Sequence, residues 1–506
     1  MGVKAGAAAI FAAIMCFGPA VAQDVTLVAR EGGIVLTGSL QGYDGEFYRI
    51  NTSYGLLTVD GQGVICEGPA CPDLAAPKAV IRLVGAADPG LALLPALFQA
   101  FADRRGLIYR PGTGDGFTAA ILDPESGKDL AEISFQPLPP DVATAALVDG
   151  DADLKLGYAP EQGLGTHSVA MDALVAIVAP DNPTPEISTL NLAKVLAGEV
   201  TNWGAIGGPD MPIVLHALQP ETAMQRALSD RLGIPVAAEI LHPDQETLAA
   251  AVALDPWAIA VTGRSFVAPA RRIPLTDSCG FPLLPTPLAV KAEDYPLALP
   301  VLLLAPQRRL PLMTREFLDF LRTPAAQAVI AANGYVDRSA TRQPMTADGL
   351  RLINAIQGAG DDITLADLKR LVNLMDGADR LSLTFRFEDG SSTLDAQSRD
   401  NLADLAQLIA SGQFRNERMV LTGFSDGSGT AAANLALSIE RAARVAQELA
   451  AVAPDLAPEI LPAIDGFGEA LPMACDETAI GRDLNRRVEL WLVPDFGGPA
   501  PEVDPL

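Results

Sequence analysis

An acidic and a basic side chain that could share one ligand stand close together in the stretch TGFSDGSGTAAANLALSIERAARV, residues 422–445. A β-like run ends at Asp426, and the helical pattern that follows carries Arg441 fifteen residues later. Such charges are usually solvated, with the acid capping its own turn and the base forming an i,i+4 surface pair. The alternative is that they are two halves of one binding site, and the surrounding elements must decide between these interpretations.

Other residue types that carry catalytic chemistry are scattered. The three histidines, His167, His216 and His242, show no metal-ligand spacing, and we expect no Gly-x-Ser-x-Gly or comparable nucleophile turn in the chain. The glycine-rich stretches GTGDG (112–116) and GSG (427–429) lack the lysine that follows in a phosphate loop. We therefore expect no catalytic residues, no metal site and no cofactor, and we interpret the protein as non-enzymatic.

The N-terminal residues MGVKAGAAAIFAAIMCFGPAVAQD have the pattern of a secretory signal peptide, residues 1–22. Lys4 gives a positive start, an apolar stretch follows, and Ala20-Val21-Ala22 forms an Ala-x-Ala cleavage site. The apolar run is shorter than the roughly 20 residues that a membrane span requires, which argues against an anchor. No other apolar run is long enough to cross a bilayer, so we expect an exported mature chain without a transmembrane segment.

Four cysteines remain after such a cleavage, and an even count in an exported chain allows disulfides. Cys66 and Cys71 enclose only Glu-Gly-Pro-Ala, a turn-forming loop, so a local disulfide between them is predicted. Zinc is the competing interpretation, but no Cys or His cluster nearby supplies two further ligands. Whether Cys279 pairs with Cys475 depends on contact between distant parts of the chain, and it stays open here.

Length and charge limit the possibilities further. A chain of 506 residues is too long for one core and indicates about three domains. Its net charge of −26 repels nucleic acid and anionic lipid, which argues against both as partners.

The strand and helix patterns divide the rest of the chain into successive parts. Residues 23–72 alternate in the two-residue rhythm of strands and predict a small antiparallel β unit. Residues 78–340 alternate strands with helices, which predicts an α/β domain, and residues 341–380 read as a packed helical connector. Strands and helices alternate again in residues 381–494, and the Pro-rich, acidic tail 495–506 is expected to be disordered.

Residues 381–494 resemble the OmpA-like peptidoglycan-binding domain. The resemblance is carried, in order and spacing, by FRFEDGSSTLDAQSRDNLADLA, TGFSDGSG, NLALSIERAARV, GFGEALP and GRDLNRRVEL. It implies that the acid of the turn and a first-turn arginine of the next helix, here Asp426 and Arg441, hold the diaminopimelate residue of the peptidoglycan stem peptide. A carboxylate pairs with the ammonium of that residue, and a guanidinium takes its carboxylate bidentately.

The resemblance also implies supporting residues around this pair. Asn434 is expected to add neutral hydrogen bonds, and Asn485 with Arg486 is expected to brace the same pocket. The turn departs from the family at Phe424, where a histidine is usual, and at Ser425, where a threonine is usual.

Residues 78–340 resemble the periplasmic solute-binding proteins of the phosphate-binding type. The resemblance is carried by LVGAADPGLALLPALFQAFADRRG, ALVDGDADLKLGYAP, AMDALVAIVAPDNPTPEISTLNLAKVLAGEVTNWGAIGGPDMPIVLHA and FLDFLRTPAAQAVIAANGYVD. It implies two α/β lobes that close on a solute held by loops and helix N-termini.

The phosphate contacts of that family do not carry over. A phosphate pocket needs hydroxyls, free N–H groups and usually an arginine, but the matching loops hold Ala86, Tyr158 and Glu221, and only Thr222 survives. Asp88 and Glu221 could instead recognise a cationic or amine-bearing ligand. Alternatively, Asp88 simply caps a helix that has proline at its first position, a common arrangement.

These expectations combine into a multidomain α/β and α+β protein of the periplasm, held non-covalently on peptidoglycan, with an association with the outer membrane left open. It has a small N-terminal antiparallel β unit, a two-lobed solute-binding-like α/β domain of altered or lost ligand specificity, a helical connector and an OmpA-like domain. The expected partners are peptidoglycan and an unknown small solute or envelope protein, without nucleic acid. Two alternatives are the phosphate-type binding component of an ABC transporter and an envelope scaffold or sensor that binds another protein.

Overall fold

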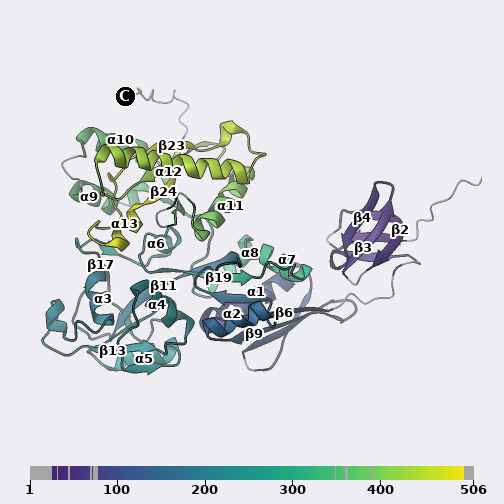
Figure 1. Ribbon diagram of the computed structural model, residues 1–506, viewed down its shortest axis with the longest axis horizontal. Coiled ribbons are helices and arrows are strands. Elements are labelled where there is room, and N and C mark those ends of the chain that lie inside the picture. Colours follow the sequence, from purple (N-terminus) through teal and green to yellow (C-terminus); the bar gives the residue numbers. More distant parts are fainter. Residues whose placement is uncertain are drawn as a thin grey trace, which may run out of the picture.

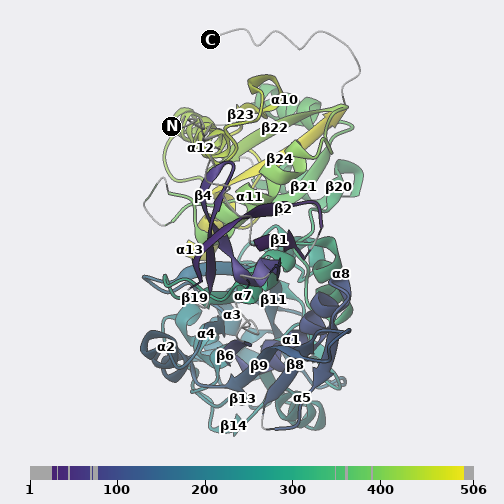
Figure 2. The ribbon, with the colours of Figure 1, turned by 90° about the vertical axis from the view of Figure 1, so that its right-hand side faces the viewer.

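The computed structural model describes residues 25–30, 32–43, 46–68, 71, 78–114, 116–347, 349–358, 363–388, 391 and 393–494. The predicted signal peptide and the predicted tail lie outside the described residues. Figures 1 and 2 show a small N-terminal sheet, a two-lobed middle domain and a C-terminal domain that lies on the middle one. Every described helix is too short or too polar to span a bilayer.

The N-terminal β unit is an antiparallel sheet in the order β4-β3-β2-β1-β5. Because successive side chains of a strand point to opposite faces, alternate residues of β1 and β3 point inward. These buried residues are Val25, Leu27, Tyr48 and Ile50. Its elements are β1 (Val25–Ala29), β2 (Val35–Tyr43), β3 (Phe47–Thr52), β4 (Gly55–Asp60), the 3-10 helix η1 (Gly61–Gly63) and β5 (Val64–Glu67).

The predicted local disulfide is confirmed: the sulfurs of Cys66 and Cys71 are 2.04 Å apart. The β unit also contacts the middle domain. Asp60 accepts a hydrogen bond from Arg315 at 2.8 Å, and the Arg309 guanidinium lies 4.2 Å from the centre of the Phe47 ring.

The middle domain is built on one long sheet in the order β14-β13-β15-β11-β19-β10-β6-β9-β8-β7, with β16 paired to β11. The strands of this sheet are β6 (Ala79–Gly85), β7 (Ile108–Pro111), β8 (Phe117–Leu122), β9 (Asp129–Pro137), β10 (Leu154–Gly157), β11 (Gly165–Val178), β13 (Val214–Leu218), β14 (Ile240–His242), β15 (Ala258–Gly263), β16 (Arg271–Arg272) and β19 (Ala298–Ala305). A small sheet contains β12 (Ile187–Ser188), β17 (Leu275–Thr276) and β18 (Pro282–Leu283). The helices are α1 (Ala87–Arg104), α2 (Pro140–Asp149), α3 (Thr189–Leu196), η2 (Trp203–Ile206), α4 (Ala223–Leu232), α5 (Gln245–Leu254), α6 (Pro287–Lys291), α7 (Leu312–Phe320) and α8 (Pro324–Ala332).

One long strand, β11, runs through both lobes of this domain. The first half of β11 pairs with β19, and its second half pairs with β15. The first lobe contains β6 to β10 with α1, α2, α7 and α8, and the second contains β12 to β18 with α3 to α6. Residues 168–178 of β11 are buried, as expected for a strand covered on both faces. The predicted two-lobed α/β architecture is confirmed.

The C-terminal domain is a sheet in the order β20-β21-β24-β22-β23 with helices on both faces. The segment predicted as a helical connector begins with a strand, β20, that pairs with β21, and its two helices pack on the face that carries Phe424 and Trp491. The elements are β20 (Arg342–Pro344), η3 (Met345–Ala347), α9 (Gly349–Gly358), α10 (Leu365–Met375), β21 (Asp379–Phe385), α11 (Ala396–Ala410), β22 (Glu417–Phe424), α12 (Ala431–Val452), η4 (Pro458–Ile460), β23 (Ala463–Gly466), α13 (Ala479–Asn485) and β24 (Arg487–Pro494).

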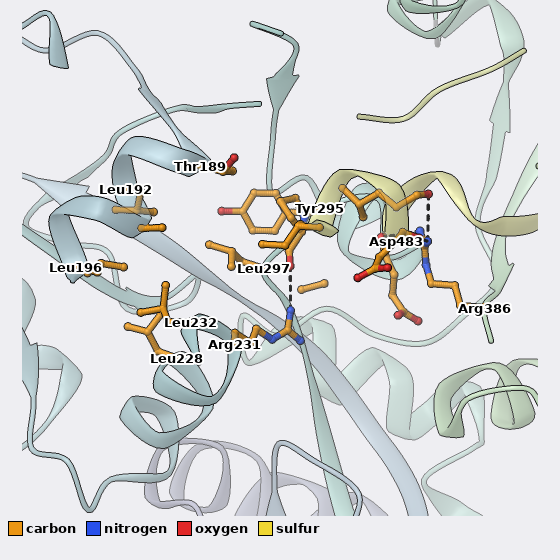
Figure 3. Close-up of a pocket in the computed structure, with 16 residues that line it drawn as sticks. Thr189, Leu192, Leu196, Leu228, Arg231, Leu232, Tyr295, Leu297, Arg386 and Asp483 are labelled. Atoms are coloured by element: carbon orange, nitrogen blue, oxygen red, sulfur yellow. Dashed lines mark hydrogen bonds between the residues drawn. The ribbon is translucent and has the colours of Figure 1, made fainter. Parts of the chain in front are cut away.

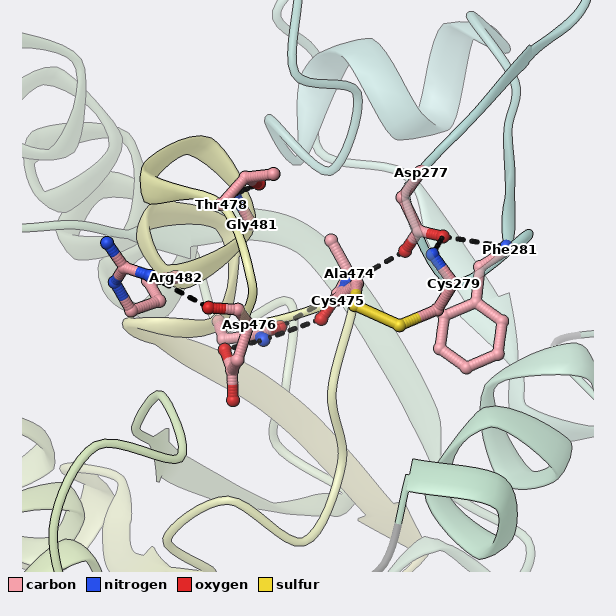
Figure 4. The surroundings of a disulfide bond; sticks show 10 residues. Asp277, Cys279, Phe281, Ala474, Cys475, Asp476, Thr478, Gly481 and Arg482 are labelled. Carbon is pink, nitrogen blue, oxygen red and sulfur yellow. Dashed lines mark hydrogen bonds between the residues drawn. A yellow bond between two sulfur atoms is a disulfide. The ribbon is translucent and has the colours of Figure 1, made fainter. Parts of the chain in front are cut away.

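A disulfide fastens the C-terminal domain to the second lobe. Cys279 and Cys475, whose pairing the sequence left open, have their sulfurs 2.01 Å apart (Figure 4). Beside this bond, Asp277 accepts a hydrogen bond from the Cys475 amide at 2.8 Å.

The C-terminal domain contacts the first lobe through ion pairs and hydrogen bonds of helix α11. Asp404 of α11 accepts hydrogen bonds from Arg322 at 2.6 Å and from Arg338 at 2.9 Å. One turn earlier, Asp400 accepts from the Ser168 amide at 3.1 Å. The same domain therefore holds both lobes.

A buried charge network crosses from the C-terminal sheet to the second lobe. Glu489, fully buried on β24, accepts hydrogen bonds from Arg351, from Arg487 at 2.6 Å and from the Trp491 indole at 3.0 Å. Arg380, 3.4 Å from the same carboxylate, donates to Asp294 of the second lobe at 2.6 Å. Buried charges need such partners, because an unpaired one is costly to desolvate.

Candidate functional site

The predicted acid lies in the loop between β22 and α12. Asp426 Oδ1 accepts a hydrogen bond from the Ser428 amide at 2.9 Å, and Oδ2 accepts one from Arg486 Nη1 at 3.1 Å. Burial acts to raise the pKa of Asp426, but the Ser428 amide and the Arg486 guanidinium outweigh it and hold the pKa below its usual value. The side chain is therefore an anion at neutral pH.

The predicted base lies on the adjoining helix. The resemblance implied an arginine in the first turn of this helix. Because α12 begins at Ala431, Arg441 instead lies in its third turn. Burial, followed by repulsion from Arg486, lowers the pKa of Arg441, and its guanidinium lies 5.9 Å from the centre of the Phe387 ring. Its Nη1 is buried and has no hydrogen-bond partner among the described residues. Asp426, Arg441 and Arg486 thus gather at one place.

The two predicted asparagines have structural partners instead. Asn434 is buried and donates to the Glu469 carboxylate. Asn485 Oδ1 accepts hydrogen bonds from the Met473 and Ala474 amides, and Asn485 Nδ2 donates to the Ala474 carbonyl and to Asp476. These four bonds use the whole side-chain amide of Asn485. Asn485 therefore shapes the 473–476 loop.

That loop in turn supports the acidic turn. Asp476 Oδ2 accepts a hydrogen bond from the Gly427 amide at 2.7 Å, directly after Asp426. The loop also carries Cys475, so the disulfide to the second lobe lies next to the residues that position the acid.

Two glycines that the sequence did not single out let α12 approach the sheet. A Cβ at Gly423 would lie 1.9 Å from the Ser438 carbonyl oxygen, and one at Gly466 would lie 2.5 Å from Ser438 Oγ. Only glycine permits this approach, which places Arg441, one turn beyond Ser438, beside the acidic turn. A single sequence holds no signal for it, because the contact is long-range.

The turn also contains a pattern that sequence reasoning missed. Residues 423–427, GFSDG, satisfy the Gly-x-Ser-x-Gly pattern of serine hydrolases and stand between a strand and a helix. Ser425 is buried, however, its Oγ has no partner among the described residues, and all three histidines lie in the middle domain. A nucleophile needs a base within hydrogen-bond reach, and none is present at this serine.

Two of the histidines meet, contrary to the expectation that all three are scattered. His216 Nδ1 and His242 Nε2 lie 3.0 Å apart on the neighbouring strands β13 and β14. Across the described ranges, no group of three or more His, Cys, Asp or Glu side chains could hold a metal ion.

A cavity of about 190 Å³ lies between the two lobes, and all five residues of the predicted solute pocket line it. Ala86 and Asp88 come from the start of α1, Tyr158 follows β10, and Glu221 and Thr222 precede α4. The Thr222 hydroxyl is already used, because it donates to the Gln219 carbonyl and accepts from the Gln225 amide. Of the hydroxyls in the predicted set, only that of Tyr158 is without a partner among the described residues.

A larger cavity, of about 300 Å³, lies where the C-terminal domain meets the second lobe (Figure 3). Leucines of α3 and α4 form much of its wall, and its arginines bind backbone carbonyls: Arg231 donates to Pro296, and Arg386 donates to Asp483 and Leu484. Arg386 also donates to the Glu293 carbonyl of the second lobe at 2.9 Å, so we interpret this cavity as part of the docking seam. No predicted site residue lines it.

Comparison with known proteins identifies the two large domains. Residues 386–486 match the OmpA family, and residues 138–324 match the PBP superfamily domain. The chain therefore contains an OmpA-family domain and a PBP-like domain, as its sequence motifs predicted.

Similar curated proteins share only parts of the chain. The phosphate-binding protein PstS of Borreliella burgdorferi is 45% identical over 53 residues, which are 10% of this chain and 19% of that protein. Outer membrane porin F of Pseudomonas fluorescens is 36% identical over 110 residues, 22% of this chain and 32% of that protein. The chain thus spans less than a third of the length of either relative.

Solved structures are similar to about half of the chain. An ABC-type phosphate transport receptor from Vibrio cholerae is 18% identical, with a TM-score of 0.40, and the match covers 51% of this chain and 99% of the receptor. A putative phosphate ABC transporter substrate-binding protein from Clostridium perfringens is 16% identical, with a TM-score of 0.41 and the same coverage.

Proposed function

We propose that this protein is a non-enzymatic component of the bacterial cell envelope that binds peptidoglycan through its OmpA-family domain. In this proposal Asp426 pairs with the ammonium of a diaminopimelate residue, and Arg441 takes the carboxylate of the same carbon. The periplasm follows as its location, with attachment to the wall by non-covalent contacts.

One observation carries the proposal: the unpartnered, buried Nη1 of Arg441 lies beside an ionised acid. A buried guanidinium N–H without an acceptor is costly, and a ligand carboxylate would satisfy it with a charge-assisted bond. Asp426 accepts hydrogen bonds from Ser428 and Arg486, and a carboxylate offers about four acceptor sites, so it can also receive an ammonium.

Isolated sacculi test this proposal. Asp426→Ala and Arg441→Ala each remove one charge-assisted contact, so each variant is expected to bind about ten- to hundredfold more weakly, with a nearly unchanged thermal melt. Arg444→Ala is the matched control, because Arg444 is exposed on the same helix and pairs with Glu448 at 2.7 Å.

A synthetic stem peptide sharpens the assignment to Arg441. Replacing diaminopimelate by lysine removes the distal carboxylate, so wild type should lose affinity while Arg441→Ala should lose nothing more. Equal losses in both proteins, or sedimentation of both variants with sacculi at wild-type levels, would refute the assignment.

For the middle domain we propose a solute-binding module that no longer holds phosphate. The support is the interlobe cavity, where Ala86 replaces a hydroxyl-bearing residue, no arginine lines the wall, and the Thr222 hydroxyl is occupied by Gln219 and Gln225. The alternatives remain testable: micromolar phosphate binding would favour an ABC transporter component, and an empty cavity would favour an envelope scaffold or sensor.

A further inference from the structure

The walls of the interlobe cavity carry one sign of charge. Three carboxylate residues line it, Asp88, Glu221 and Asp244, and its lining contains no lysine, arginine or histidine. A cavity lined by acids alone concentrates cations and repels anions.

The helix dipoles add positive charge at the same cavity, so their size relative to the carboxylates decides the sign of its net charge. The N-termini of α1, α4 and α5 border the cavity, and each is equivalent to about half a positive charge. Their sum, about 1.5 charges, is smaller than the negative charge that three carboxylate side chains can carry. The cavity therefore favours a positive ligand even after the dipoles are counted.

Polar groups at this cavity also lack partners. The Tyr158 hydroxyl, on a side chain that is only 7% exposed, lines the cavity and has no hydrogen-bond partner among the described residues. Behind it, the Tyr335 hydroxyl and Asp172 Oδ2 are buried and equally without partners there. Asp88, Asp172 and Tyr335 all act electrostatically on Tyr158, so the three lie close to it. Orphaned buried groups of this kind indicate a missing hydrogen-bonding occupant.

We propose that the interlobe cavity binds a small organic cation, a primary ammonium group on a compact apolar body, with Asp88 and Tyr158 receiving its N–H groups. This inference rests on the proposed loss of phosphate binding by the middle domain. The body of the ligand packs against Leu138, Leu218 and Met224. At about 190 Å³ the cavity is smaller than the usual site for a drug-sized molecule, which limits the ligand to a few carbon atoms.

Titration calorimetry of the purified full chain at pH 7.5 tests the proposal. n-Butylammonium is expected to give a saturable one-site isotherm below about 10 mM, whereas n-butyrate, its anionic counterpart, and inorganic phosphate give none. Tetramethylammonium carries the same charge without N–H donors and should bind at least about tenfold more weakly.

Two variants locate the site. Asp88→Asn should weaken n-butylammonium binding about ten- to hundredfold. Tyr158→Phe should weaken it severalfold while leaving the melting temperature unchanged or raised, because it removes an unpartnered buried hydroxyl. Asp149→Asn, at the exposed far end of α2, is the matched control and should bind like wild type.

Each contrary outcome has its own meaning. A saturable phosphate isotherm would overturn both this inference and the proposed loss of phosphate binding. No isotherm with any probe would overturn the cation site alone and leave the proposed loss standing. Unchanged n-butylammonium binding by Asp88→Asn would place the cation elsewhere and also refute the inference.

Discussion

Replacing Glu489 by glutamine removes the charge at the centre of the buried network in the C-terminal sheet. The carboxylate accepts hydrogen bonds from Arg351, Arg487 and the Trp491 indole, and it lies 3.4 Å from Arg380. Without it, three buried guanidinium groups lose the carboxylate that they share, whereas the pair of Arg380 with Asp294 stays.

The cost of this change can be worked out from the burial of the network. Removing one partner of a buried ion pair typically costs about 3–5 kcal/mol, because the remaining charge stays desolvated. In a domain of this size, 1 kcal/mol lowers the melting temperature by about 2–4 °C, so the C-terminal transition should fall by about 6–20 °C. The same substitution at Glu448, an exposed partner of Arg444, should cost less than about 1 kcal/mol.

Differential scanning calorimetry of the full chain, with hydrogen exchange of the β24 amides to assign the transition, measures this difference. Burial acts to raise the pKa of Glu489, but Arg351, Arg380 and Arg487 outweigh it and hold the pKa well below its usual value. The contribution is therefore fully present above about pH 4.3, the unfolded value, and is lost only as the pH falls further. A Glu489→Gln transition within 2 °C of the Glu448→Gln transition, on the order of measurement error, would refute the reasoning.

Two further predictions concern the middle domain and the sheet. Burial raises the pKa of Asp172 to about 7, against a smaller effect of Arg264, so the folded chain keeps a proton that the unfolded chain loses near pH 4. Wild type should lose a few kcal/mol relative to Asp172→Asn between about pH 4 and 7, and parallel melting curves of the two proteins over this range would contradict it. Gly423→Ala should cost about 1–3 kcal/mol and weaken sacculus binding, because the new methyl group meets the Ser438 carbonyl, whereas Gly349→Ala, with open space around it, should change neither.

Local signals predicted much of this molecule. The spacing of Cys66 and Cys71 predicted their disulfide, and the alternation of strands and helices predicted the two-lobed domain, because both depend on neighbouring residues. The resemblance also brought Asp426 and Arg441 to one place, although the start of α12 puts the arginine two turns further along its helix than expected.

Features that depend on docking could not be predicted. The pairing of Cys279 with Cys475 requires the C-terminal domain to lie on the second lobe, and no local pattern encodes that contact. Asn485 has the residue type expected of a ligand contact, yet its amide is fully used by the 473–476 loop. The orphaned hydroxyl of Tyr158 likewise becomes visible only when the lobes surround it.

The C-terminal domain is attached to the two lobes in different ways, so the two attachments differ in strength. A covalent bond joins Cys475 to the second lobe, whereas Asp400 and Asp404 hold the first lobe by contacts that can break and reform. If the lobes part, the second lobe and the C-terminal domain stay together as the fixed frame, and the first lobe is the part that swings. The N-terminal β unit is joined to the first lobe through Asp60 and Arg315, so it would move together with that lobe.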